Sequence, residues 1–134
     1  MPHVVINYSE NLEPLVDMAA FCREIAAALV AQKDANGMPV FPTGGTRVFA
    51  YPARHCAIAD GNGEYAFCYV NMRIAKGRSE ATKTAAGDAL LRLAQARFAD
   101  AFAKGRVGVT IQIDESPGQV YDAKHSNLHP LFKP

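Results

Sequence analysis

The chain opens with Met1-Pro2-His3-Val4-Val5-Ile6, a short polar start that passes at once into an apolar, β-branched run. Such a run, with little alternation between apolar and polar residues, is typical of a strand at the centre of a sheet. Removal of Met1 would leave Pro2 as a secondary amine at the start of that strand. An α-amino group has a pKa of about 7.7 to 8, so modest burial or a nearby cation makes it a usable base at neutral pH. The same tripeptide also fits a terminus without any chemical role.

The composition bounds the class of protein. A length of 134 residues fits one compact domain, so we expect residues 1–134 to form a single domain. Lysine and arginine number 14 against 13 acidic residues, and this balance favours neither nucleic acid nor a membrane surface as partner. No apolar run is long enough to span a bilayer and no cleavable signal precedes the first strand, which predicts a cytoplasmic protein.

Cysteine and histidine spacing argues against a disulfide framework or a metal site. Cys22, Cys56 and Cys68 are odd in number and lack CxxC spacing, so we expect reduced thiols. The four histidines show no HExxH or other paired ligand spacing. We therefore expect no metal.

Two segments carry apolar residues at helical spacing. Start signals at Pro14 and Asp17 precede the first helix, which we expect to end near Lys33. Ser79 is the candidate N-cap of the second helix, which we expect to continue without a break until Gly105 closes it. Both helices should be amphipathic.

Three further segments favour strands, at about residues 47–58, 65–74 and 107–113. The second of these has the clearest strand pattern, and the third alternates apolar with polar residues. Between the first two lies Asp60-Gly61-Asn62-Gly63, a strong turn signal. This arrangement predicts an antiparallel hairpin between residues 47–58 and 65–74.

The order of elements is one β-α-β unit repeated, roughly over residues 2–58 and 64–115, with a tail at 116–134. Parallel strands within each unit and the hairpin between the units predict an α/β (α+β) fold with a mixed four-stranded sheet and two helices on one face. Two helices cannot cover both faces of such a sheet. Apolar side chains from all four strands should therefore occupy the other face and be buried against further subunits.

Short motifs that run the length of the chain carry a family resemblance. They are Pro2-His3, Tyr8-Ser9-Glu10-Asn11-Leu12, the loop from Phe41-Pro42 to Arg47, Ala59-Asp60-Gly61, Tyr65-Ala66-Phe67, Gly77-Arg78-Ser79 and His129-Pro130-Leu131-Phe132-Lys133. In this order and spacing they resemble the 5-carboxymethyl-2-hydroxymuconate isomerase family of the tautomerase superfamily. The resemblance implies a cofactor-free homotrimer of tautomerase-like β-α-β repeats, with an active site around each N-terminal proline near a subunit boundary.

Carried over residue by residue, the resemblance implies that Pro2 is the catalytic proton shuttle and that Arg47 and Arg78 bind substrate. The implied reaction, in the degradation of aromatic compounds, is ketonisation of a 2-hydroxymuconate-type dienol such as 5-carboxymethyl-2-hydroxymuconate. A single base near neutral pKa suits this reaction, because only bonds to hydrogen break. Guanidinium groups suit the carboxylates of such a substrate, which they bind through two parallel hydrogen bonds.

Other interpretations of the same residues stay open at this point. The substrate could be another small enol such as phenylpyruvate, or the chain could be a non-catalytic trimeric binding protein that retains Met1. Arg47 could form a surface ion pair, and Arg78 could be a solvent-exposed residue before a helix. For His3, whose side chain should point away from that of Pro2 in an extended strand, we expect a structural role.

Overall fold

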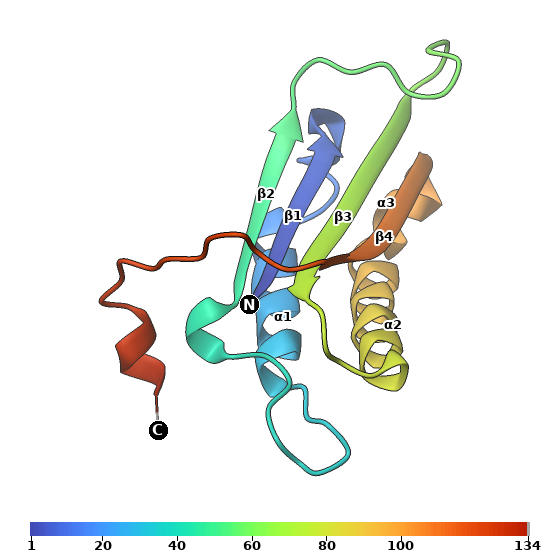
Figure 1. Ribbon diagram of the computed structural model, residues 1–134. Coiled ribbons are helices and arrows are strands. Elements are labelled where there is room, and N and C mark those ends of the chain that lie inside the picture. Colours follow the sequence, from blue (N-terminus) through green and yellow to red (C-terminus); the bar gives the residue numbers. More distant parts are fainter. Residues whose placement is uncertain (134) are drawn as a thin grey trace.

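The computed structural model describes residues 1–133, and within them four strands form one mixed sheet (Figure 1). The strands are β1 (Pro2–Ser9), β2 (Arg47–Ala53), β3 (Tyr65–Ala75) and β4 (Arg106–Ser116), arranged in the order β2-β1-β3-β4. β1 runs parallel to β2, β3 runs parallel to β4, and β1 is antiparallel to β3. The two β-α-β units and the mixed four-stranded sheet predicted from the sequence are confirmed.

The predicted hairpin between β2 and β3 is wrong. β2 and β3 lie on opposite sides of β1, so residues 54–64 cross over the end of β1 instead of joining paired strands (Figure 1). The turn at Asp60 does form, with the Asn62 amide donating to the Asp60 carboxylate at 2.9 Å. A hairpin in the predicted order would have left β1, the most continuously apolar strand, at an edge. The observed order pairs both of its backbone edges.

The helices begin where the sequence predicts. α1 (Met18–Ala31) has Asp17 as N-cap, whose carboxylate accepts a hydrogen bond from the Ala20 amide at 3.0 Å. α2 (Glu80–Arg97) has Ser79 as N-cap, whose hydroxyl accepts from the Thr82 amide at 3.2 Å. These side chains satisfy amides that the first helical turn leaves without a partner.

The second helix is interrupted, contrary to the prediction of one continuous element. α2 ends at Arg97, and the short α3 (Ala99–Lys104) follows after Phe98, whose backbone leaves the helical region. The Phe98 ring is buried and meets the Phe21 ring of α1 edge to face, with 5.5 Å between ring centroids. Core packing of this ring therefore accompanies the break.

Both α1 and α2 cover the same face of the sheet (Figure 1), and the side chains between them and the strands form the core. The strand residues of this core include Val4, Ile6, Cys68, Val70 and Met72, all 0% exposed. In β4 the apolar residues also turn toward the core, namely Val107, Val109, Ile111 and Ile113.

The open face of the sheet differs from the prediction in one strand. Because the apolar residues of β4 pack toward the helices, β4 contributes Gly108, Thr110 and Gln112 to the other face. The exposed aromatic side chains there come from β2 and β3: Phe49, Tyr51 and Phe67. The expectation that all four strands supply apolar side chains to this face is therefore wrong for β4.

The segment after β4 returns to the start of the chain. It passes across the strand ends near the N-terminus, and its 3-10 helix η3 (His129–Phe132) lies against η2 (Thr43–Gly45) (Figure 1). The contact is close, since a Cβ on Gly44 would lie 3.2 Å from the Cα of His129. Within residues 1–133, no helix combines the length and apolar character needed to cross a membrane.

Candidate active site

Strand directions bring three distant segments to one end of the sheet. In the parallel pair His3 lies opposite Arg47, and in the antiparallel pair Pro2 lies opposite Ile74. The start of β1, the start of β2 and the end of β3 therefore lie at the same end of the sheet, and Arg78 follows three residues after β3. Pro2, Arg47 and Arg78 come together at this end of the sheet although 76 positions separate the first from the last.

Pro2 is buried at the start of the central strand, and the Met1 that precedes it is half-buried. While Met1 is present, the Pro2 nitrogen is part of a peptide bond and has no basic lone pair. The backbone of η2 approaches this terminus, because a Cβ added to Gly45 would lie 3.5 Å from both the nitrogen and the Cα of Met1. Such distances are ordinary van der Waals contacts, so η2 packs directly against the terminal residue.

Arg47 reaches the terminus from β2 through three contacts. Its Nε donates to Nδ1 of His3 at 3.0 Å, and its Nη1 donates to the Gly45 carbonyl at 3.1 Å. The third nitrogen, Nη2, lies 3.0 Å from the sulfur of Met1. The guanidinium is thus held by the protein on two nitrogens and faces the terminal residue with the third.

Arg78 reaches the same region from the turn between β3 and α2. Its Nη1 donates to the Ala75 carbonyl at 3.0 Å and its Nη2 to the Val40 carbonyl at 3.2 Å. Its guanidinium also lies over the buried Phe41 ring, 4.7 Å from the centroid. Two hydrogen bonds and one stacking contact therefore orient a cation that has five donors in all.

Within residues 1–133, no carboxylate forms an ion pair with Arg47 or Arg78. By contrast, Arg97 of α2 is bonded to both carboxylate oxygens of Glu24 on α1, at 3.0 and 2.6 Å. Of these three arginines, Arg97 alone forms a structural ion pair within residues 1–133. The interpretation of Arg47 as one half of a surface ion pair does not hold for the described residues.

Burial and nearby cations at this end of the sheet both change the pKa of the terminal amine. Burial lowers the pKa of the Met1 amine below its usual value of 8.0, and the positive charges of Arg78, Arg47 and Lys124 lower it further, in that order. Desolvation and neighbouring cations both disfavour the protonated form of an amine.

Two residues at this end of the sheet were not predicted from the sequence as site residues. His3 faces Arg47 directly, a contact that the register of the β1–β2 pair would have revealed. Lys124 comes from the tail, which has no periodicity, and it is ion-paired with Asp122 at 2.9 Å. No pattern in the sequence signals that this tail returns to the N-terminus.

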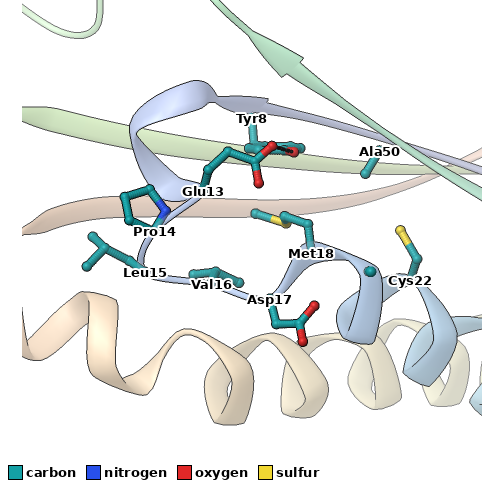
Figure 2. Close-up of a pocket in the computed structure, with 10 residues that line it drawn as sticks. Tyr8, Glu13, Pro14, Leu15, Val16, Asp17, Met18, Cys22 and Ala50 are labelled. Atoms are coloured by element: carbon teal, nitrogen blue, oxygen red, sulfur yellow. Dashed lines mark hydrogen bonds between the residues drawn. The ribbon is translucent and has the colours of Figure 1, made fainter.

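A cavity of about 700 Å³ lies elsewhere, between the end of β1 and the start of α1 (Figure 2). The Tyr8 hydroxyl donates to the Glu13 carboxylate there at 2.7 Å, and burial raises the pKa of Tyr8. None of the three residues predicted for the site lines it. Residues 1–133 also contain no cluster of three or more histidine, cysteine or acidic side chains that could hold a metal ion.

Known proteins of one family are similar to this chain over nearly its whole length. The model of the family described as 5-carboxymethyl-2-hydroxymuconate isomerase matches residues 2–132. The 5-carboxymethyl-2-hydroxymuconate Delta-isomerase of Escherichia coli is 26% identical over 133 residues, which cover 99% of this chain and 100% of that protein.

Solved structures agree with this result. A crystal structure of a 5-carboxymethyl-2-hydroxymuconate delta-isomerase is 49% identical, with a TM-score of 0.93 over 100% of this chain and 94% of that one. A 5-carboxymethyl-2-hydroxymuconate isomerase from Deinococcus radiodurans R1 is 29% identical, with a TM-score of 0.84 over 99% and 95% of the two chains. The resemblance inferred from the motifs is confirmed. The chain belongs to the 5-carboxymethyl-2-hydroxymuconate isomerase family and is an isomerase.

Proposed function

We propose that this isomerase is a cytoplasmic, cofactor-free tautomerase that ketonises a 2-hydroxymuconate-type dienol, such as 5-carboxymethyl-2-hydroxymuconate, in the degradation of aromatic compounds. Pro2, freed by removal of Met1, is the acid and base, and Arg47 and Arg78 bind the substrate carboxylates. The observation that carries this proposal is the convergence of both arginines on the terminal amine, whose pKa their charges lower.

The chemistry needs one group that accepts and then returns a proton. The Pro2 amine removes the proton of the 2-hydroxyl group, the oxygen becomes a carbonyl, and the electron pair of the enol moves along the conjugated chain. The protonated amine then delivers a proton to a carbon farther along that chain, so the base is regenerated. A base whose pKa lies near the working pH makes neither transfer strongly uphill.

The arginines suit the substrate because they are fixed in place and have donors to spare. Their contacts at this edge are with backbone carbonyls, His3 and Met1, and within residues 1–133 none is with a carboxylate. A substrate carboxylate would therefore not compete with an internal one. As negative charge spreads toward the carbonyl end of the dienolate, the same guanidinium groups stabilise it.

Met1 blocks the proposed base and contacts one of the two proposed substrate-binding arginines. Its peptide bond removes the basic lone pair of Pro2, and its sulfur lies 3.0 Å from Nη2 of Arg47. Trimming of Met1 would thus create the base and release an arginine donor beside it in one step. Both consequences favour the trimmed chain as the active form.

We further propose that the protein is a homotrimer. The helices cover one face of the sheet only, while Phe49, Tyr51 and Phe67 remain 45%, 53% and 38% exposed on the other. In the tail, Val120 and Tyr121 are almost fully exposed. Exposed aromatic and aliphatic side chains of this kind are typical of surfaces that associate. Sedimentation of a compact monomer at micromolar concentration would contradict this part of the proposal.

The direct test combines intact mass with activity. We expect the native protein to lack Met1 and to accelerate ketonisation of a 2-hydroxymuconate dienol. The loss of dienol absorbance measures the rate of this reaction. A Pro2→Leu variant, in which the bulky second residue protects Met1 from removal, should lose about 10²- to 10⁴-fold in kcat, the usual contribution of a positioned acid or base. A retained Met1 in the native protein together with no activity above background would favour a non-catalytic binding protein.

Another small enol, such as phenylpyruvate, is the second candidate substrate. It carries one carboxylate and so would need only one of the two arginines. A diacid should have the higher kcat/KM, and either arginine variant should reduce that preference. Equal kcat/KM values for phenylpyruvate and the muconate dienol would support the second candidate.

A further inference from the structure

The contact between His3 and Arg47 assigns a role to a residue outside the proposed machinery. The two residues lie opposite each other in the parallel β1–β2 pair, and Nε of Arg47 donates to Nδ1 of His3 at 3.0 Å. An arginine N–H can only donate, so Nδ1 of His3 must carry a lone pair and the proton of the neutral ring must be on Nε2. The contact therefore exists only while the imidazole is neutral.

We propose that His3 is a positioning residue, whose unprotonated Nδ1 holds the Arg47 guanidinium in the orientation that receives a substrate carboxylate. This inference rests on the proposed function, because it assumes that Arg47 binds such a carboxylate. Protonation of His3 would remove the acceptor and place a second positive charge against the guanidinium, so substrate binding should weaken in acid.

The geometry explains why this one hydrogen bond matters. With Nε held by His3 and Nη1 by the Gly45 carbonyl, only Nη2 is directed at the terminal residue, where it meets the Met1 sulfur at 3.0 Å. Loss of the His3 contact would leave the guanidinium attached through one nitrogen and free to rotate. A planar, forked donor binds a carboxylate well only when its plane is fixed.

The surroundings of His3 favour the neutral ring. Burial and the neighbouring Arg47 charge both lower the pKa of His3. On its other side His3 is paired with Arg73 of β3, and the Phe49 ring of β2 packs edge-on against it with 5.7 Å between ring centroids. The terminal amine lies two residues before His3 in the chain. None of these neighbouring groups is a carboxylate that would stabilise a protonated imidazole.

Two substitutions separate the acceptor from the shape of the side chain. His3→Phe keeps a planar ring and removes the acceptor, whereas His3→Asn places an amide oxygen close to the position of Nδ1 and does not titrate. Intact mass must first show the same loss of Met1 in both variants as in the native protein. The Arg47→Ala variant is the reference for complete loss of the guanidinium.

At neutral pH we expect His3→Phe to raise KM for the dienol diacid about tenfold, the value of one hydrogen bond to a charged group, with kcat within about twofold of the native value. His3→Asn should restore KM to within about threefold. In the native protein KM should rise as the pH falls through the pKa of His3, and in His3→Asn this rise should be absent. A native KM in His3→Phe beside a raised KM in Arg47→Ala would overturn this inference alone.

Nuclear magnetic resonance of the ring nitrogens provides a readout independent of activity. We expect the Nε2-protonated tautomer at neutral pH, and a higher pKa of His3 in Arg47→Ala, because that variant removes both the cation and the donor to Nδ1. A proton on Nδ1, or an unchanged His3 titration in Arg47→Ala, would contradict the proposal. An unchanged KM in Arg47→Ala would instead overturn the carboxylate role of Arg47, and this inference with it.

Discussion

The two ends of the sheet have the same strand arrangement and differ in the residues that lie there. At one end His3 of β1 is paired with Arg47 at the start of β2, and at the other end Tyr65 of β3 is paired with Arg106 at the start of β4. Each β-α-β unit thus begins its second strand with an arginine. The antiparallel contact between β1 and β3 directs the two arginines to opposite ends.

The end that carries Arg106 is closed by neutral hydrogen bonds. The Ser9 hydroxyl accepts from the Phe67 amide at 2.9 Å, and the Asn11 side chain donates to the Tyr65 carbonyl at 2.8 Å. Arg106 itself is exposed. These hydrogen bonds join β1 and the residues that follow it to the start of β3.

The end that carries Arg47 instead gathers cations around a chain terminus. Arg47, Arg78 and Lys124 all act on the terminal amine there. A repeated unit supplies the scaffold twice, but a chain has only one amino terminus, so only one of the two ends can present a terminal amine. The position of the amino terminus, rather than the repeated fold, therefore distinguishes the candidate site.

The largest difference between the two ends should come from the arginines that begin β2 and β4. Arg47→Ala removes a charge-assisted hydrogen-bond donor and should lower kcat/KM for the muconate dienol by about 10- to 100-fold, equivalent to about 1.5–3 kcal/mol. Arg106→Ala, the matched change at the opposite end, should remain within about twofold, as expected for an exposed charge. Steady-state kinetics on both variants makes the comparison, and equal losses would erase the difference between the two ends.

A change at the closed end should act on stability instead. Ser9→Ala leaves the partly buried Phe67 amide without its partner and should lower the free energy of unfolding by about 0.5–1.5 kcal/mol. Denaturant unfolding monitored by circular dichroism measures this loss. Activity per folded molecule should stay at the native level, and a selective loss of kcat would show that the closed end takes part in the reaction.

The pKa of the terminal amine should respond to Arg47 but not to Arg106. A nearby cation disfavours the protonated amine, so Arg47→Ala should raise the pKa of the Pro2 amine toward its usual range and reduce the fraction of free base at neutral pH. Titration of a ¹⁵N-proline label in trimmed protein reports this directly. The same titration in Arg106→Ala should match the native protein, and a native value in Arg47→Ala would remove Arg47 from the field at the terminus.

The smallest effect should come from Lys124, which is the last of the three cations to act on the amine and is half-exposed. Exposed charges contribute about 0–1 kcal/mol, so Lys124→Ala should lower kcat/KM by up to about fivefold at low salt. The difference should vanish at about 1 M salt, where screening is strong. Lys104→Ala, at the opposite end of the sheet, is the control and should behave like the native protein at every salt concentration.

Local patterns allowed most elements to be predicted, and the failures share a physical cause. The caps at Asp17 and Ser79 depend on contacts within one helical turn, so short-range chemistry was enough to predict them. The hairpin failed because a turn signal at Asp60-Gly61 describes only four residues. Strand order depends on which strand needs both edges paired, and that is a property of the whole sheet.

The break at Phe98 and the faces of β4 show the same limit. A helical stripe runs through Phe98 without a local stop signal, yet packing of its ring against Phe21 accompanies an interruption. The alternation in β4 was correctly predicted, but alternation does not say which set of side chains faces the helices. Contacts between distant segments decide both.

The sequence by itself determined the kinds of element, the repeated plan and the family, because periodicity, capping residues and motifs are all written along the chain. It also contained the proposed site residues Pro2, Arg47 and Arg78. Only the tertiary structure brought the two arginines to one amine, paired His3 with Arg47 and returned the tail with Lys124 to the terminus. These relations depend on strand order and on long-range packing, because electrostatic and hydrogen-bond energies depend on distances in space rather than on separation along the chain.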